Sequence, residues 1–100
     1  MYHNDFNSIV LEPPRASVVP SYKTVNIGDT VVFRCSVSGY PSPTITWRRG
    51  GGKLLSPTTK IDGFELKIRD IQATEEGDYI CKAENRGGSV ERRAMLYVIG

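Results

Sequence analysis

Two cysteines, Cys35 and Cys81, are the residues of this chain best suited to covalent or metal chemistry. A zinc site needs further cysteine or histidine ligands at short spacing, and a nucleophilic thiolate needs a neighbouring base. Neither cysteine has such a neighbour in the sequence, and the only histidine, His3, stands near the N-terminus. We therefore expect no catalytic residue, no metal site and no bound cofactor, and the chain is not expected to be an enzyme.

The segment around the second cysteine, EEGDYICKAENRGG at residues 75–88, allows two interpretations. A strand could bury alternate side chains, form a bond through Cys81 and end in a tight turn. Alternatively, a reactive thiol could lie beside a glycine-rich ligand loop. Tyr79, Cys81 and Ala83 share one face of such a strand, and this phase buries Cys81. Because reactive thiols are partly exposed, the strand is the favoured interpretation.

Short segments with period-two alternation and intervening turn residues continue along the chain. Strands are expected at residues 30–38, 44–48, 64–69, 78–84 and 90–98, and the only helical fragment is one turn near residues 72–76. The predicted inward residues are Val31, Phe33, Cys35, Val37, Ile45, Trp47, Phe64, Leu66, Ile68, Tyr79, Cys81, Ala83, Ala94, Leu96 and Val98. Strands of this length and spacing predict an all-β sandwich or a small barrel.

Length and composition are those of one globular domain. The chain has 100 residues, 39% hydrophobic and 24% charged, and a net charge of +2, which is too mild to indicate nucleic-acid binding. Residues 1–11 are expected to be a flexible lead-in and residues 12–98 the domain. No apolar run is long enough to insert into a membrane. The first residues lack the pattern of a signal peptide, so a secreted form is expected to come from a longer precursor.

Four motifs together resemble the I-set immunoglobulin domain: GDTVVFRC (28–35), ITWR (45–48), LKI (66–68) and the segment at 75–88. The matched positions are Gly28, Cys35, Gly39, Pro41, Trp47, Leu66, Gly77, Tyr79, Cys81, Ala83, Asn85 and Gly87. The resemblance implies an immunoglobulin-like β-sandwich of two antiparallel sheets with Greek-key connections. The short interval from Trp47 to Leu66 leaves no room for the extra strand pair of a variable-type domain.

The resemblance also assigns roles within the core. It implies a disulfide between Cys35 and Cys81 that packs on Trp47, with Leu66 beside it, and a loop this long gives about 4 kcal/mol of stabilisation. It implies that the Tyr79 hydroxyl bonds to the backbone of the preceding corner. Glu75 departs from the family, which commonly has aspartate here, so the ion pair that this aspartate makes with an arginine is left open.

The family includes several kinds of protein, which the resemblance does not separate. The run Ser38–Arg49 is similar to neural adhesion proteins of the lachesin and IgLON type, and matrix proteins of the perlecan type and muscle proteins of the titin type have related domains. The resemblance implies a non-catalytic protein-binding or spacer module of a multi-domain adhesion or matrix protein at the cell surface or outside the cell. One alternative is an intracellular muscle or cytoskeletal module with reduced cysteines. The lack of an Asn-X-Ser/Thr glycosylation site favours it slightly. A second alternative is a glycosaminoglycan-binding module.

Strand phase predicts two candidate binding faces on the outside of the sandwich. The expected protein partners are neighbouring immunoglobulin domains or an adhesion partner, including a second copy of the same protein. The candidate residues for protein contact are Arg48, Ile80, Lys82, Arg93, Met95 and Tyr97, of which the apolar members would be exposed and ringed by charge. The weaker candidates for glycosaminoglycan binding are Arg34, Lys67 and Arg69, whose positive charge Glu65 dilutes.

Overall fold

The computed structural model describes residues 10–100, so His3 and most of the predicted lead-in lie outside the described residues. The described chain forms eight strands: β1 (Glu12–Val19), β2 (Tyr22–Asn26), β3 (Val31–Tyr40), β4 (Thr44–Arg49), β5 (Thr59–Asp62), β6 (Glu65–Ile68), β7 (Gly77–Asn85) and β8 (Gly88–Ile99). Two short 3₁₀ turns, η1 (Gly50–Gly52) and η2 (Ala73–Glu75), complete the elements. The division at residue 12 stays a prediction.

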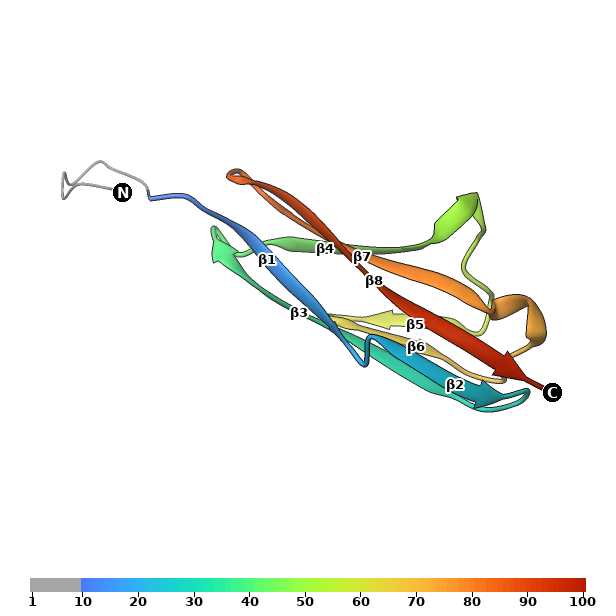
Figure 1. Ribbon diagram of the computed structural model, residues 1–100. Helices are drawn as coiled ribbons and strands as arrows, with labels where there is room; N and C mark the ends of the chain where they lie inside the picture. The colour runs from blue at the N-terminus through green and yellow to red at the C-terminus, as the bar shows by residue number, and fades with distance from the viewer. Residues whose placement is uncertain (1–9) are drawn as a thin grey trace.

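The strands form two packed sheets, as Figure 1 shows. One sheet has the order β1-β3-β6-β5 and the other β2-β8-β7-β4. All neighbouring strands are antiparallel except β2 and β8, which run parallel from Tyr22–Met95 to Asn26–Ile99. The chain therefore changes sheet between β1 and β2. The predicted all-β immunoglobulin-like sandwich is confirmed.

The core lies between the sheets and follows the alternation expected from the sequence. Strand β3 is buried at every second residue from Val31 to Cys35, and β8 buries Ala94 and Leu96 in the same way. Alternate side chains of a strand point to opposite faces, so each of these strands has one apolar face against the core. Within residues 10–100 no helix is long and apolar enough to cross a membrane.

The inward placement predicted for Phe64 is wrong. Phe64 lies in the turn between β5 and β6, which pair from Asp62–Glu65 onward, and 53% of its surface is exposed. Its carbonyl oxygen accepts a hydrogen bond from the amide of Cys35 at 2.9 Å. Phe64 is in phase with the inward residues Leu66 and Ile68, but it precedes Glu65, the first residue of β6 that is paired. The pleat of the sheet therefore does not point its side chain into the core.

Candidate functional site

The two cysteines are joined across the sheets by a disulfide with a Cα–Cα distance of 6.4 Å. Both are fully buried, and Trp47 lies opposite Cys81 in the β4–β7 register. The implied disulfide is confirmed, and the reactive-thiol interpretation fails because the sulfur atoms are bonded to each other and removed from solvent. Within residues 10–100, no group of three or more histidine, cysteine, aspartate or glutamate side chains is placed to hold a metal ion.

The corner before β7 is fixed by Tyr79 and Glu75. The buried Tyr79 hydroxyl donates to the Glu75 carbonyl oxygen at 2.7 Å, as the resemblance implied. The Glu75 carboxylate is also buried and accepts hydrogen bonds from the Ser56 hydroxyl at 2.6 Å and from the backbone amide of Gln72 at 2.8 Å. None of the ion pairs in the described part of the chain includes Glu75. At this position the carboxylate of Glu75 is therefore bound by a hydroxyl and a backbone amide, and not by an arginine as in the family.

Arg49 is a buried residue that lies one position beyond the strand expected at residues 44–48. Only 7% of its surface is exposed, and its Nη2 donates to the Glu76 carbonyl oxygen at 2.9 Å. Its guanidinium also lies 5.1 Å from the centre of the Tyr79 ring, within the range of a cation–π interaction. Strand phase could have identified it, because Trp47 faces inward and Arg49 is two residues further along the same strand.

Asn85 at the end of β7 connects three segments. Its amide nitrogen donates to the carbonyl oxygens of Glu12 at 2.8 Å and Pro41 at 2.9 Å, and its side-chain oxygen accepts from the Gly87 amide at 2.7 Å. The resemblance matched this residue without giving it a role. Its position explains the match, because one side chain closes the β7–β8 turn and ties it to β1 and to the segment before β4.

The predicted protein-contact residues do come together on the outer face of β4, β7 and β8. Three ion pairs cross this face: Arg48 with Glu91 at 2.9 Å, Arg93 with Asp78 at 2.9 Å and Lys82 with Glu84 at 3.9 Å. Arg48 makes two hydrogen bonds to Glu91, and this contact lowers the pKa of the Glu91 carboxyl. The cations of this face are therefore neutralised by their own neighbours.

Ile80 does not have the exposure that its place in the predicted contact face requires. It points outward, away from the central core, yet only 6% of its surface is exposed. Its direct neighbours in register are Arg48 on β4 and Arg93 on β8. Long side chains lay their aliphatic stems over apolar surface while the charged ends stay in water. The paired arginines thus shield Ile80, and it is removed from the exposed contact residues.

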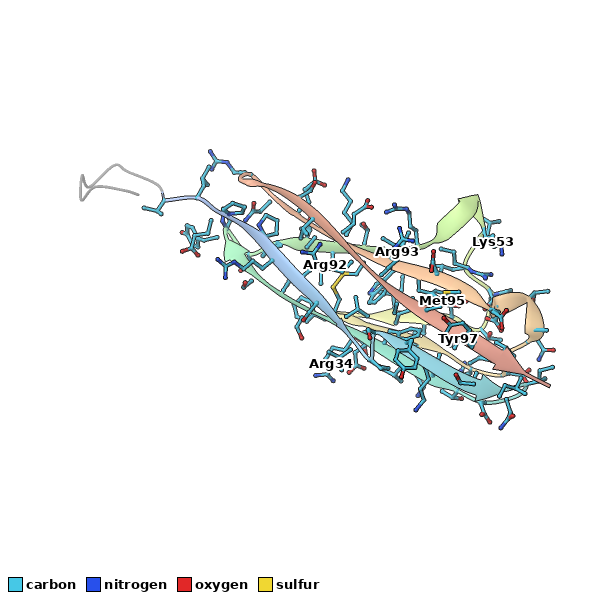
Figure 2. The ribbon with its side chains drawn as sticks, in the orientation of Figure 1. Arg34, Lys53, Arg92, Arg93, Met95 and Tyr97 are labelled. Carbon is cyan, nitrogen blue, oxygen red and sulfur yellow. A yellow bond between two sulfur atoms is a disulfide. The ribbon has the colours of Figure 1, made fainter. Side chains whose placement is uncertain are left out.

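Exposed apolar side chains gather instead where β2 runs beside β8. Tyr22 is next to Met95 in register, Thr24 next to Tyr97, and Asn26 next to Ile99. Tyr22 is 65% exposed, Tyr97 43% and Ile99 57%, and Met95 is half-buried. Figure 2 labels Met95 and Tyr97, which both come from β8. We call Tyr22, Met95, Tyr97 and Ile99 the apolar strip. The sequence reasoning missed Tyr22 because it did not foresee the parallel pairing of β2.

The predicted glycan-binding residues are all exposed, Arg34 and Lys67 on strands of the other sheet and Arg69 directly after β6, but they are not equivalent. Arg34 forms an ion pair with Glu65, its neighbour across β3 and β6. Lys67 lies opposite Lys60 of β5, which the sequence reasoning did not include. A surface hollow of about 280 Å³ is lined by Lys60, Asp62, Glu65, Lys67 and Arg69.

Comparison with known proteins agrees with this architecture. Residues 14–98 match the model of the immunoglobulin I-set domain. Human Roundabout homolog 1 is 40% identical over 90 residues, which cover 89% of this chain and 6% of that protein. The mouse basement membrane-specific heparan sulfate proteoglycan core protein is 36% identical over 85 residues, which cover 85% of this chain and 2% of that protein. The chain thus spans less than a tenth of either relative.

A solved structure of a chimeric titin Z1Z2 protein is also similar, with a TM-score of 0.78 and 28% sequence identity. The match covers 91% of this chain and 98% of that one. The family match extends over most of the described residues and includes both cysteines, Trp47 and Tyr79. The chain belongs to the immunoglobulin I-set domain family.

Proposed function

We propose that this chain is a non-catalytic, protein-binding and spacing module of a larger multi-domain adhesion or extracellular-matrix protein. Its domain contacts a protein partner, either another protein or a second copy of itself, through the outer face of the β2-β8-β7-β4 sheet. The proposed contact residues are the apolar strip together with Arg48, Lys82 and Arg93. Neighbouring immunoglobulin domains of the parent protein are further partners.

The apolar strip is the observation that carries this proposal. Three of its four members are exposed and Met95 is half-buried; they lie on two adjacent strands, and ion pairs border them on β7 and β4. Contiguous exposed apolar side chains with a polar rim are typical of protein contact surfaces. Tyrosine is enriched at such surfaces because it presents a large apolar ring and a polar tip.

The buried disulfide supports a location outside the cell or at its surface, because disulfides persist in oxidising compartments. The similarity to the titin chimera favours the alternative of an intracellular structural module. The intact mass of protein purified from its natural source under non-reducing conditions distinguishes the two. Under the extracellular proposal, reduction raises the mass by two hydrogen atoms. A natural form that already has both thiols free supports the intracellular module.

The contact face is tested with beads coated with the chain and with tetramers of the chain applied to cells. The beads report self-association, and the tetramers report binding to another protein. Replacing Tyr97 by Glu and Tyr22 by Ser should abolish whichever binding the wild type has. Phe64→Glu is the matched control, because it alters an aromatic residue whose exposed fraction of 53% lies between those of Tyr97 and Tyr22, in a turn of the other sheet. Binding that survives the Tyr97 and Tyr22 changes, or no binding by wild type in either format, refutes the proposed face.

A further inference from the structure

The cations on the two outer faces of the sandwich differ in whether they form ion pairs with neighbouring carboxylates. On β4, β7 and β8, each of Arg48, Lys82 and Arg93 has a carboxylate partner within 4.0 Å. On the opposite sheet, Arg34 is paired with Glu65. Lys60, Lys67 and Arg69 are exposed and take part in none of the ion pairs formed within residues 10–100. Lys23 of β2 and Arg92 of β8 are also exposed and outside these ion pairs, so Lys60, Lys67 and Arg69 are distinguished by lining one hollow together.

Lys60, Lys67 and Arg69 lie close together because of the strand register. Lys60 and Lys67 are direct cross-strand partners, whose Cβ atoms are about 5 Å apart in such pairs. Arg69 follows Lys67 by two residues, about 7 Å along an extended chain, and its amide bonds to the Thr58 carbonyl oxygen. Like charges directly opposite each other destabilise a sheet. An anion bound between them would remove that repulsion.

The lining of the hollow favours a particular kind of anion. Besides the three cations it contains Asp62 and Glu65, and it has no aromatic residue. Single-stranded nucleic acids bind through aromatic side chains on which the bases stack, and none lines this hollow. A sulfated sugar instead offers sulfate groups for lysine and arginine and hydroxyl groups that donate to carboxylates such as Asp62.

We infer that Lys60, Lys67 and Arg69 form a binding site for a sulfated glycosaminoglycan on the outer face of β5 and β6. The sulfates lie between the three cations, and the sugar hydroxyls donate to Asp62. Arg34 is excluded as a ligand because Glu65 already neutralises it. The site is on the sheet opposite the apolar strip, so it does not depend on the proposed protein-contact face.

The test measures the affinity of the whole chain for a heparin oligosaccharide at about 0.1 M salt, where surface charges are only partly screened. The variant Lys60→Gln/Lys67→Gln/Arg69→Gln should bind about tenfold more weakly or worse, because each exposed charge contact changes affinity by a few-fold. The matched control, Arg48→Gln/Lys82→Gln/Arg93→Gln, loses the same formal charge from the other sheet and should stay within about twofold of wild type. An equal loss in the control means that only overall charge matters, and it overturns the site.

Two further arms separate sulfate recognition from general attraction to anions. Chemically desulfated heparin and single-stranded oligothymidylate should each bind wild type much more weakly than heparin does. Equal binding of either polymer, or no binding of heparin by wild type, overturns the assignment.

The backbone amide chemical shifts of the wild-type chain, recorded with and without heparin, locate the binding site without any variant. Heparin should move the signals of residues 58–69, and movement confined to β4, β7 and β8 overturns the site.

Discussion

The hydroxyl of Tyr79 donates to the carbonyl oxygen of Glu75 at 2.7 Å, and the guanidinium of Arg49 lies 5.1 Å from the centre of the same ring. Both contacts are on the side of the domain where η2 leads into β7. A buried carbonyl oxygen without a partner is costly, and η2 is too short to satisfy its own backbone groups. The tyrosine therefore supplies a hydrogen bond that the local backbone cannot make.

Replacing Tyr79 by Phe keeps the ring but leaves the Glu75 carbonyl oxygen without a partner. The free energy of unfolding should fall by about 1–3 kcal/mol, which is the cost of an unsatisfied buried acceptor. Chemical denaturation followed by the fluorescence of Trp47 measures it. Tyr97→Phe, on the exposed outer face, should change stability by less than about 0.5 kcal/mol. An unchanged Tyr79→Phe variant would show that water replaces the hydroxyl.

The same tyrosine should also make stability depend on alkaline pH. Burial, which is the largest effect, raises the pKa of Tyr79 to about 12, with the Arg49 charge opposing and the Glu75 charge adding to the shift. Since tyrosine in an unfolded chain titrates near about 10, the unfolded state loses its proton first. This contribution is complete below about pH 10 and is lost as pH rises to about 12. The Tyr79→Phe variant should lack this part of the decline, and an identical decline in both proteins would contradict it.

Arg48 and Arg49 are adjacent arginines that point to opposite faces of β4. Arg49→Met removes the hydrogen bond to the Glu76 carbonyl oxygen and the contact with the Tyr79 ring. The free energy of unfolding should therefore fall by about 1–3 kcal/mol. Arg48→Met removes an exposed ion pair but keeps an apolar stem beside Ile80, so it should cost much less than Arg49→Met. Thermal unfolding of the two variants side by side gives the comparison. Equal losses would mean that the burial of Arg49 contributes nothing.

Asn85 should be sensitive to even small changes, because its side chain makes three hydrogen bonds to backbone groups. Asn85→Ala removes all three, and the expected loss is about 1–3 kcal/mol of unfolding free energy. Asn85→Asp keeps an acceptor for the Gly87 amide but places a carboxylate against the carbonyl oxygens of Glu12 and Pro41, so it should be no better. Hydrogen exchange should rise at β1 and near Pro41. Glu84→Ala, at the exposed neighbouring position, serves as the control.

Much of this fold could be predicted because five strands, β3, β4, β6, β7 and β8, each have one face in the core. Their inward residues alternate with polar ones, and that pattern is visible without any knowledge of their partners. The short edge strand β5 is mostly exposed and shows little alternation, so it was not identified. Strands β1 and β2 belong to different sheets, and the change of sheet depends on pairing with residues far along the chain.

The candidate surfaces were predicted less well, because exposure depends on lateral neighbours. The outward phase of Ile80 was correct, but Arg48 and Arg93 come beside it only through strand pairing. In the same way, Tyr22 joins Met95 through the parallel β2–β8 register. Lys60 joins Lys67 through the β5–β6 register. Strand phase gives the face on which a side chain lies, whereas its environment is set by contacts distant in sequence.

The ion pair between Arg48 and Glu91 offers a direct check of the outer face. The hydrogen bonds from Arg48, followed by its charge and those of Lys82 and Arg93, hold the pKa of the Glu91 carboxyl below its usual value. A carboxyl with a lowered pKa stabilises the fold above its unfolded pKa, and this contribution disappears as pH falls through the folded pKa. Since both side chains are well exposed, the change in total stability should be small.

The titration of the Glu91 carboxyl can be followed by the NMR chemical shift of its side-chain carboxyl carbon. The pKa of Glu91 should be lowered in wild type and should rise toward its usual value in Arg48→Gln. A Glu91 pKa that Arg48→Gln does not move would mean that the pair is not formed in solution, and Ile80 would then lose one of the two side chains that shield it.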